Sequence, residues 1–157
     1  MSLLHELDRE AKSTAMVLAR VPADKLDWAP HPKSMTIGAL AAHIAGIPAR
    51  VAQLLQAGRF DVGSARPAPA RDTDDFVGLL HRSLDEAKRV IATLADDGEI
   101  LLVRGDEVLR RLPKSALIRD VLINHTIHHR GQLTVYLRLL DIPVPAVYGT
   151  SADESAF

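Results

Sequence analysis

The amino-acid sequence predicts an all-α protein, a four-helix bundle formed by one domain over residues 1–157. Three observations support this fold class. Four segments of helical length repeat their apolar residues at the spacing that defines one face of a helix. Only one short segment has a strand-like composition. The hydrophobic content of 47% is enough to form the core of a single domain of this length.

The first two helices are expected over residues 2–18 and 34–55. Ser34 or Thr36 can cap the start of the second helix, and Gly58 follows its end. Pro48 lies inside the second helix, where it removes one backbone hydrogen bond and should bend the chain. The bend is either a tolerated kink or a means of opening room beside a site.

The third helix is expected over residues 73–94, with Asp72 or Thr73 as its cap. The segment 58–72 before it can extend ~50 Å, whereas a 20-residue helix is ~30 Å long. A long crossover loop is therefore expected, which allows the second and third helices to run parallel. Residues 99–112 are β-prone around a Gly105-Asp106 turn and predict a short hairpin or an extended loop.

The fourth helix is expected over residues 115–140. At about 100° per residue, its apolar residues form a broad arc that includes Val135 and Leu139. His125 and His129 fall inside this arc, whereas Arg130 falls on the other side. A second apolar strip of Ala116, Ile123 and Ile127 lies opposite the histidines. That strip either packs on the hairpin or forms a dimer interface.

The four-residue spacing of His125 and His129 is the most informative feature of the chain. Residues four apart project from one helical face, one turn above the other. This spacing lets a helix present two nitrogen ligands to one metal ion. The alternative is that each ring hydrogen-bonds a neighbour and packs, but two buried polar rings need partners, and a metal ion supplies one. We therefore favour metal binding.

A third ligand must come from elsewhere in the chain, because two ligands seldom hold a metal ion. The chain has no cysteine, so the remaining candidates are histidine and carboxylate. His43 borders the apolar stripe of the second helix. His5 lies near the chain end, His31 between two prolines and His81 beside the stripe of the third helix, positions typical of surface residues. His43 is the best candidate, although periodicity alone leaves it open.

Four segments of the chain resemble the DinB/YfiT family. They are residues 28–35 (WAPHPKSM), 40–43 (LAAH), 124–133 (NHTIHHRGQL) and 140–149 (LDIPVPAVYG). The resemblance implies a four-helix bundle with one metal-binding histidine on the second helix and two, four apart, on the last. On this sequence these are His43, His125 and His129, whereas His128 is outside the pattern. The resemblance also implies a homodimer.

Composition narrows the range of partners. Nineteen basic residues balance 20 acidic ones without clustering, which argues against a nucleic-acid surface. No secretory signal is visible at the N-terminus, and no uninterrupted apolar stretch reaches the ~20 residues of a membrane helix. We expect a cytoplasmic protein that acts on a small molecule.

Three imidazole ligands leave a coordination position open, as in catalytic rather than closed structural sites. Zinc, nickel or iron(II) suits imidazole, and cobalt and copper also accept it. The ion can activate water or hold a thiol as thiolate. The family resemblance implies the thiol route, a transferase using an external low-molecular-weight thiol. A hydrolase and a non-catalytic metal-binding stress protein are the alternatives.

Three further residues are candidates for the site. Gln132 and Tyr136 share the histidine face of the fourth helix and are candidate catalytic residues, through hydrogen bonds to substrate or to a ligand. Arg50, seven residues after His43, is a candidate for binding an anionic group of the thiol or substrate. The alternative for Gln132 and Tyr136 is packing without a role in the site, and the alternative for Arg50 is a solvated side chain. A ferritin-like di-iron site is disfavoured, because the required Glu-x-x-His pairs are absent.

Overall fold

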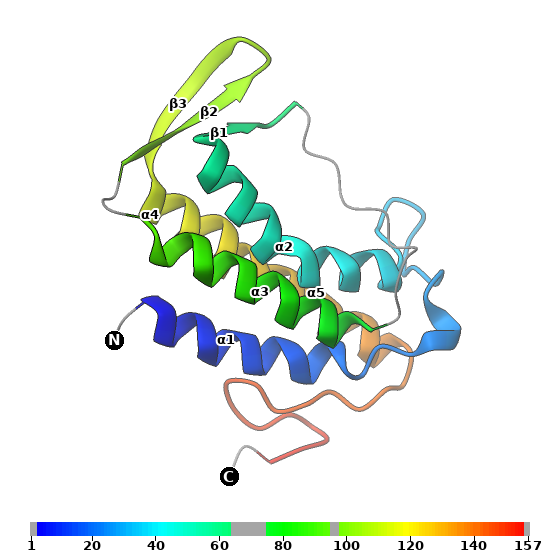
Figure 1. The fold of residues 1–157 in the computed structure, drawn as a ribbon. Coiled ribbons are helices and arrows are strands. Elements are labelled where there is room, and N and C mark those ends of the chain that lie inside the picture. Colours follow the sequence, from blue (N-terminus) through cyan, green and yellow to red (C-terminus); the bar gives the residue numbers. More distant parts are fainter. Residues whose placement is uncertain (1–2, 64–74, 95–97, 156–157) are drawn as a thin grey trace.

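A computed structural model describes residues 3–63, 75–94 and 98–155. Four long helices form the bundle, and a small three-stranded sheet lies at one end of it (Figure 1). The elements in chain order are α1 (Leu3–Leu18), η1 (Ala23–Lys25), α2 (Ile37–Ala57), β1 (Arg59–Asp61), α3 (Phe76–Ala92), β2 (Glu99–Arg104), β3 (Glu107–Pro113), α4 (Lys114–Leu117), η2 (Ile118–Asn124) and α5 (His125–Leu139).

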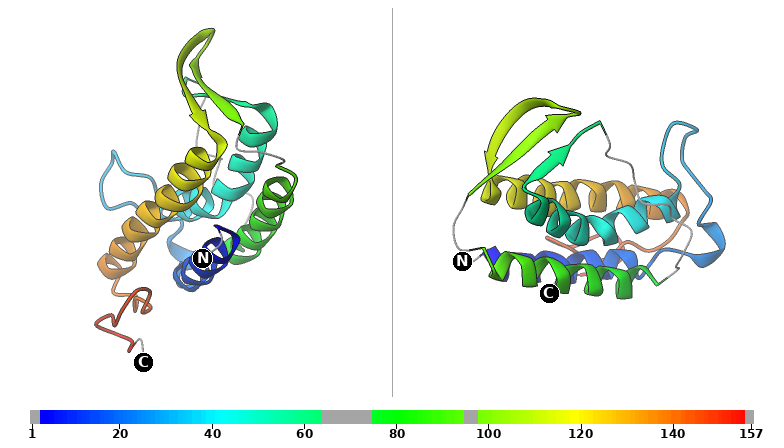
Figure 2. Two further views of the ribbon diagram at one scale, coloured as in Figure 1. Left: turned by 90° about the vertical axis from the view of Figure 1, so that its left-hand side faces the viewer. Right: turned by 45° about the horizontal axis from the view of Figure 1, so that its top comes forward.

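The helices run in two directions. α2 and α3 are parallel to each other and antiparallel to α1 and α5 (Figures 1 and 2). α2 packs against α3 and α5, and α1 packs against the same two helices from the other side. The parallel arrangement expected for the second and third helices is thus confirmed, although most of the connecting loop, residues 64–74, lies outside the described residues.

The predicted helix ends are close to those observed. The Thr36 hydroxyl caps α2 by accepting a hydrogen bond from the backbone N–H of Ala39, and Gly58 ends the helix with a left-handed φ of 64°. Asp75, rather than the residues expected, caps α3. At the bend, the N–H of Ala49 donates to the Ser83 hydroxyl at 2.8 Å, so α3 satisfies a donor beside Pro48.

The expected hairpin is present, and a third strand joins it. β2 and β3 are antiparallel, with Gly105 in the turn at φ 59°, and the hairpin extends beyond the end of the bundle (Figure 2). β1 pairs with β2 in parallel, with Phe60 opposite Leu102. This short strand after α2 was not predicted, because three residues are too few to show an alternating pattern.

Two apolar clusters fill the bundle. One lies toward the sheet and includes Leu7, Val51, Ile100 and Leu122, and the other includes Val17, Leu40, Leu80, Leu133 and Leu137. Among the described helices, α2 alone is long and apolar enough to cross a membrane, but 67% of that apolar window is buried within the fold. α2 is therefore read as the core helix of the bundle.

The predicted fourth helix is continuous but not uniformly α-helical. Its middle segment, η2, is a π-helix that ends directly before His125. A π-turn holds one more residue than an α-turn, which shifts the downstream residues by about 100° on an α-helical wheel. Two predictions are therefore wrong. Val135 and Leu139 are 57% and 58% exposed, and Arg130, expected on the outer side, is only 2% exposed.

The second apolar strip on this helix lies largely inside the chain. Ile123 is 2% exposed within the core cluster near the sheet, and Ile127 packs against the same cluster. Ile123 therefore stabilises the monomer and is unavailable to a dimer interface, whereas Ala116 and Ile127 are only partly buried. The homodimer itself stays a prediction.

Candidate metal centre

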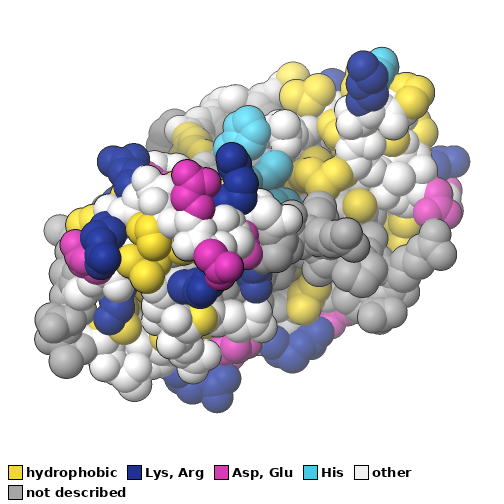
Figure 3. All heavy atoms as spheres, turned by 90° about the horizontal axis from the view of Figure 1, so that it is seen from above, with side chains coloured by type: hydrophobic (Ala, Val, Ile, Leu, Met, Phe, Trp, Pro, Cys, Tyr) yellow, Lys and Arg dark blue, Asp and Glu magenta, His cyan; other side chains and the backbone are white. Residues whose placement is uncertain are grey.

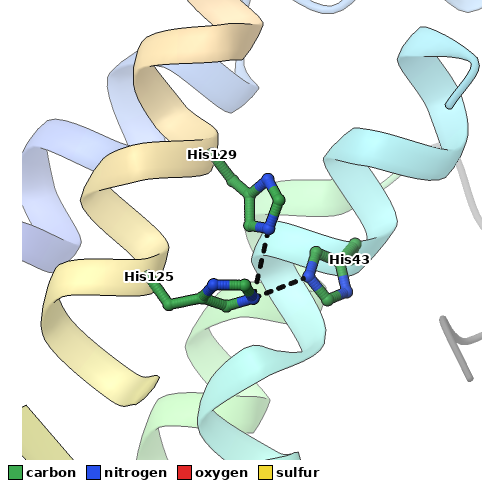
Figure 4. Close-up of side chains that lie close together, drawn as sticks. All are labelled: His43, His125 and His129. Carbon is green, nitrogen blue, oxygen red and sulfur yellow. Dashed lines mark hydrogen bonds between the residues drawn. The ribbon is translucent and has the colours of Figure 1, made fainter. Parts of the chain in front are cut away.

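Three histidines from two adjacent helices meet at one point. His43 comes from α2, and His125 and His129 come from consecutive turns of α5 (Figure 4). The Nε2 atom of His125 lies 3.2 Å from Nε2 of His43 and 3.1 Å from Nε2 of His129. Within the described part of the chain, these three residues form the sole group of potential ligands that converges in this way.

The nitrogen separations fit a shared metal ion. Ligands at the 2.0–2.1 Å typical of zinc–imidazole bonds lie about 3.3 Å apart in a tetrahedral arrangement. The separations of Nε2 of His125 from Nε2 of His43 and of His129, 3.2 and 3.1 Å, are close to this value. The predicted ligand set therefore converges: two histidines one turn apart on the last helix and one histidine on the second helix bring their ring nitrogens together.

Hydrogen bonds among the rings cannot satisfy all three nitrogens. The Nδ1–H of His129 donates to Oε1 of Gln132 at 2.7 Å, so the neutral ring carries its lone pair on Nε2. A single proton on Nε2 of His125 cannot be directed at both neighbouring Nε2 atoms. A cation that accepts one lone pair from each ring satisfies all three at once, so the residues fit a bound divalent metal.

The electrostatics favour the neutral, metal-binding form of each ring. Burial, followed by repulsion from His129 and His125, lowers the pKa of His43 to about 4. Burial also lowers the pKa of His125 and of His129, and the hydrogen bond to Gln132 partly opposes the shift in His129. At neutral pH the three lone pairs are therefore available without competition from protons.

The site is open to the surface. All three ligand candidates are half-buried. In the view from above, histidine side chains gather near the middle of the face (Figure 3). No carboxylate or fourth histidine of the described residues joins the group. A bound ion would therefore keep at least one position for an external ligand.

The other candidate residues differ in their relation to this centre. Gln132 accepts a hydrogen bond from His129, one of the three ligand candidates. Tyr136 is half-buried against Trp28, with the ring centroids 5.7 Å apart in an edge-to-face arrangement. Trp28, the packing partner of Tyr136, was not predicted to lie near the site, because the two residues are 108 positions apart in the sequence. Arg50 is exposed on α2, and His128 is exposed beside His129 without joining the three ligands.

Fold and site together define a helical bundle with a three-histidine cluster between two of its helices. The model of the DinB family matches residues 1–156, and the chain belongs to this family. Its fold is similar to that of the DinB-like protein YjoA of Bacillus subtilis, with a TM-score of 0.67, 20% identity, and coverage of 90% of this chain and 95% of that one. A DinB-like protein of Bacillus cereus ATCC 10987 gives a TM-score of 0.67 and 22% identity, over 92% and 95% of the two chains.

One curated relative is similar over a shorter stretch. The uncharacterized protein YrdA of Bacillus subtilis strain 168 is 40% identical over 47 residues. This match spans 30% of the present chain and 28% of the length of YrdA. The solved structures therefore support the fold and not a particular chemistry.

Proposed function

We propose that this protein is a metal-dependent transferase that brings a low-molecular-weight thiol to an electrophilic small molecule. The observation that carries the proposal is the convergence of three Nε2 atoms with no fourth ligand among the described residues. The chain contains no cysteine, so sulfur must come from outside. The resemblance to a family with thiol-using members favours this chemistry over the other reactions of an open site.

In this proposal, one set of residues holds the metal ion and another orients the reactants. His43, His125 and His129 would hold a divalent ion, with zinc, nickel and iron(II) as the best candidates for three imidazoles. When bound, the ion would keep an external thiol as the thiolate near neutral pH, and the thiolate is the nucleophilic form of sulfur. Gln132 fixes the ring of His129, and Tyr136 and Arg50 are the candidates for contacting the substrate or an anionic group of the thiol.

Metal content is the first test. The purified protein should contain about one zinc, nickel or iron atom per chain by elemental analysis. The protein should then be assayed with a panel of thiols against a chlorodinitrobenzene-type electrophile. Conjugation that requires both metal and thiol supports the transferase, and His125→Ala is the matched inactive control.

The same assay separates the alternatives. Cleavage of an activated ester without thiol would favour a hydrolase. Stoichiometric metal with neither activity would favour a non-catalytic metal-binding protein. Addition of thiol to cobalt-substituted protein should also change its visible absorption spectrum, and an unchanged spectrum with every thiol would remove the proposed mechanism.

A further inference from the structure

A buried ion pair between Arg130 and Glu10 joins α5 to α1, one residue after His129 in the sequence. Arg130 is 2% exposed and Glu10, on α1, is 6% exposed. Nη2 of Arg130 donates to Oε2 of Glu10 at 2.9 Å, and Nη1 donates to the Glu10 carbonyl at 3.2 Å and to Oγ1 of Thr14 at 3.1 Å. Thr14 in turn donates to the same carbonyl. One guanidinium therefore joins α5 to a full turn of α1.

The C-terminal segment completes this network through Tyr148. Tyr148 as a residue is 65% exposed, but its hydroxyl turns inward, accepts a hydrogen bond from Nη2 of Arg130 and donates one to Oε2 of Glu10. The guanidinium carbon lies 4.9 Å from the ring centroid, within range of a cation–π interaction. The network thus ties together three segments that are far apart in the sequence.

Hydrophobic packing alone does not explain such a network. Removing two charges from water costs several kcal/mol per ion, and apolar residues of similar volume often stabilise a fold equally well. Buried polar groups instead restrict how elements can be arranged, because alternative arrangements leave charges unpaired. The Glu10–Arg130 pair therefore restricts how α5 can rotate and slide against α1.

The orientation of α5 is critical for the histidines. Arg130 directly follows His129, so any rotation of α5 that moves one side chain moves the other. Side-chain atoms ~5–6 Å from a helix axis move by about 1 Å when the helix turns by about 10°. Metal–ligand distances vary by only about 0.2 Å. The π-helical η2 lies immediately upstream of α5. Its extra residue changes the direction in which the side chains of α5 point. A contact downstream of η2 is therefore needed to hold α5 in one orientation.

We propose that the Glu10–Arg130–Tyr148 network is the positioning device that sets the rotation of α5 and so aligns His125 and His129 with His43. The inference rests on the proposed metal centre and extends it to residues outside that centre. Arg130, Glu10 and Tyr148 contact neither ligand nor substrate in this scheme, and they act through the helix that carries two of the ligands.

The test compares two contacts that hold the C-terminal segment against α5: that of Tyr148 with the buried Glu10–Arg130 pair, and that of Asp153 with Arg138. Tyr148→Phe removes the hydroxyl and keeps the ring, and Glu10→Gln removes the charge of the buried partner. Arg138→Gln is the matched control, because the exposed Arg138 on α5 binds Asp153 of the same segment outside the network. Cobalt affinity is measured by chelator competition, with the visible spectrum of the bound ion as a second readout and urea unfolding of the metal-free protein as a reference.

We expect Tyr148→Phe and Glu10→Gln to weaken cobalt binding by about 10-fold or more, as for other groups that orient metal ligands, and to alter the spectrum of the bound ion. Arg138→Gln should bind cobalt with the wild-type affinity and spectrum. Wild-type affinity and spectra in both network variants would overturn the inference, as would equal losses in the Arg138→Gln control. If Glu10→Gln does not fold, Tyr148→Phe decides alone, because Tyr148 is an exposed residue and the substitution removes only its hydroxyl.

Two results for the wild-type protein distinguish failure of the proposed transferase function from failure of the positioning network. A wild-type protein that binds cobalt tightly but shows no thiol transfer would refute the transferase and leave the positioning test valid. A wild-type protein that binds no divalent metal would refute both.

Discussion

Nδ1 of His129 donates a 2.7 Å hydrogen bond to Oε1 of Gln132, and this contact decides which ring nitrogen faces His125. The two residues are three apart on α5, so their side chains are neighbours on one helical face. With the proton held on Nδ1, the lone pair of Nε2 points toward the centre formed with His43. Gln132 is therefore placed to orient His129, one of its two predicted roles, and its contact with substrate stays a prediction.

Replacing this acceptor should weaken metal binding. Gln132→Leu leaves Nδ1 of His129 without its partner and frees the ring to rotate, so we expect a 10–100-fold loss of zinc affinity. Gln132→Glu keeps an acceptor at the same position and should retain the affinity or increase it. Competition with a chromogenic chelator measures both. Equal affinities for the Leu variant and wild type would show that the contact does not orient the ligand.

The three ligands should each be required, and their histidine neighbour should not. His43→Ala, His125→Ala and His129→Ala each remove one of three donors, so less than about a tenth of the metal should remain after dialysis. His128→Ala is the control, because His128 is exposed and outside the converging group. Elemental analysis of the four variants gives the answer, and full metal content in any of the three ligand variants would exclude that residue.

Acid should destabilise the metal-free protein between about pH 6.5 and 4. The pKa of His43 is lowered from 6.5 to about 4, so in this window the unfolded chain binds the proton that the folded chain excludes. Stability is therefore complete above pH 6.5 and is lost as the pH falls. Each such histidine contributes at most about 1.4 kcal/mol per pH unit to the slope.

Urea unfolding at several pH values can show whether His43 causes this pH dependence of the unfolding free energy. His43→Gln should flatten the pH dependence, because the glutamine does not titrate. His31→Gln, at an exposed position outside the centre, should leave the wild-type slope unchanged. A His43→Gln variant with the full wild-type slope would show that another group causes the loss.

Ile123 should support the monomer rather than an interface. It is 2% exposed in the core cluster near the sheet, so Ile123→Glu buries an unpaired charge and should cost several kcal/mol of unfolding free energy. Val135→Glu, at a position 57% exposed, should change stability by less than about 0.5 kcal/mol. Chemical denaturation compares the two. Sedimentation of the wild type independently tests the homodimer that the family resemblance predicts.

The helices and the pairing of His125 with His129 were predictable because both depend on local periodicity. Thr36 and Gly58 mark the ends of α2, and the i, i+4 spacing of His125 and His129 survives because both lie downstream of η2. His43 needed the family resemblance, since periodicity alone does not show that α2 and α5 are adjacent.

The partners of the last helix were not predictable on the same basis. A constant 100° per residue placed Arg130 outside and Val135 inside, and the π-turn reverses both assignments. No local signal in the sequence reveals a π-turn, because its extra residue is tolerated by tertiary packing. The contact of Arg130 with Glu10 joins residues 120 positions apart, which a helical wheel cannot show.

Removing the metal should leave the protein folded but less stable. The two apolar clusters do not depend on the histidines, so the chelator-treated protein should keep its helical circular dichroism and unfold cooperatively. Zinc at 100 times its dissociation constant should add about 2.7 kcal/mol of unfolding free energy. For a chain of this size that corresponds to an increase in Tm of about 5–10 °C, reversible with chelator. His125→Ala should show no increase, since the ion would lose a ligand, whereas His128→Ala should behave as wild type. A metal-free protein that is unfolded would instead make the ion structural, and an equal zinc effect in His125→Ala would mean that zinc binds elsewhere.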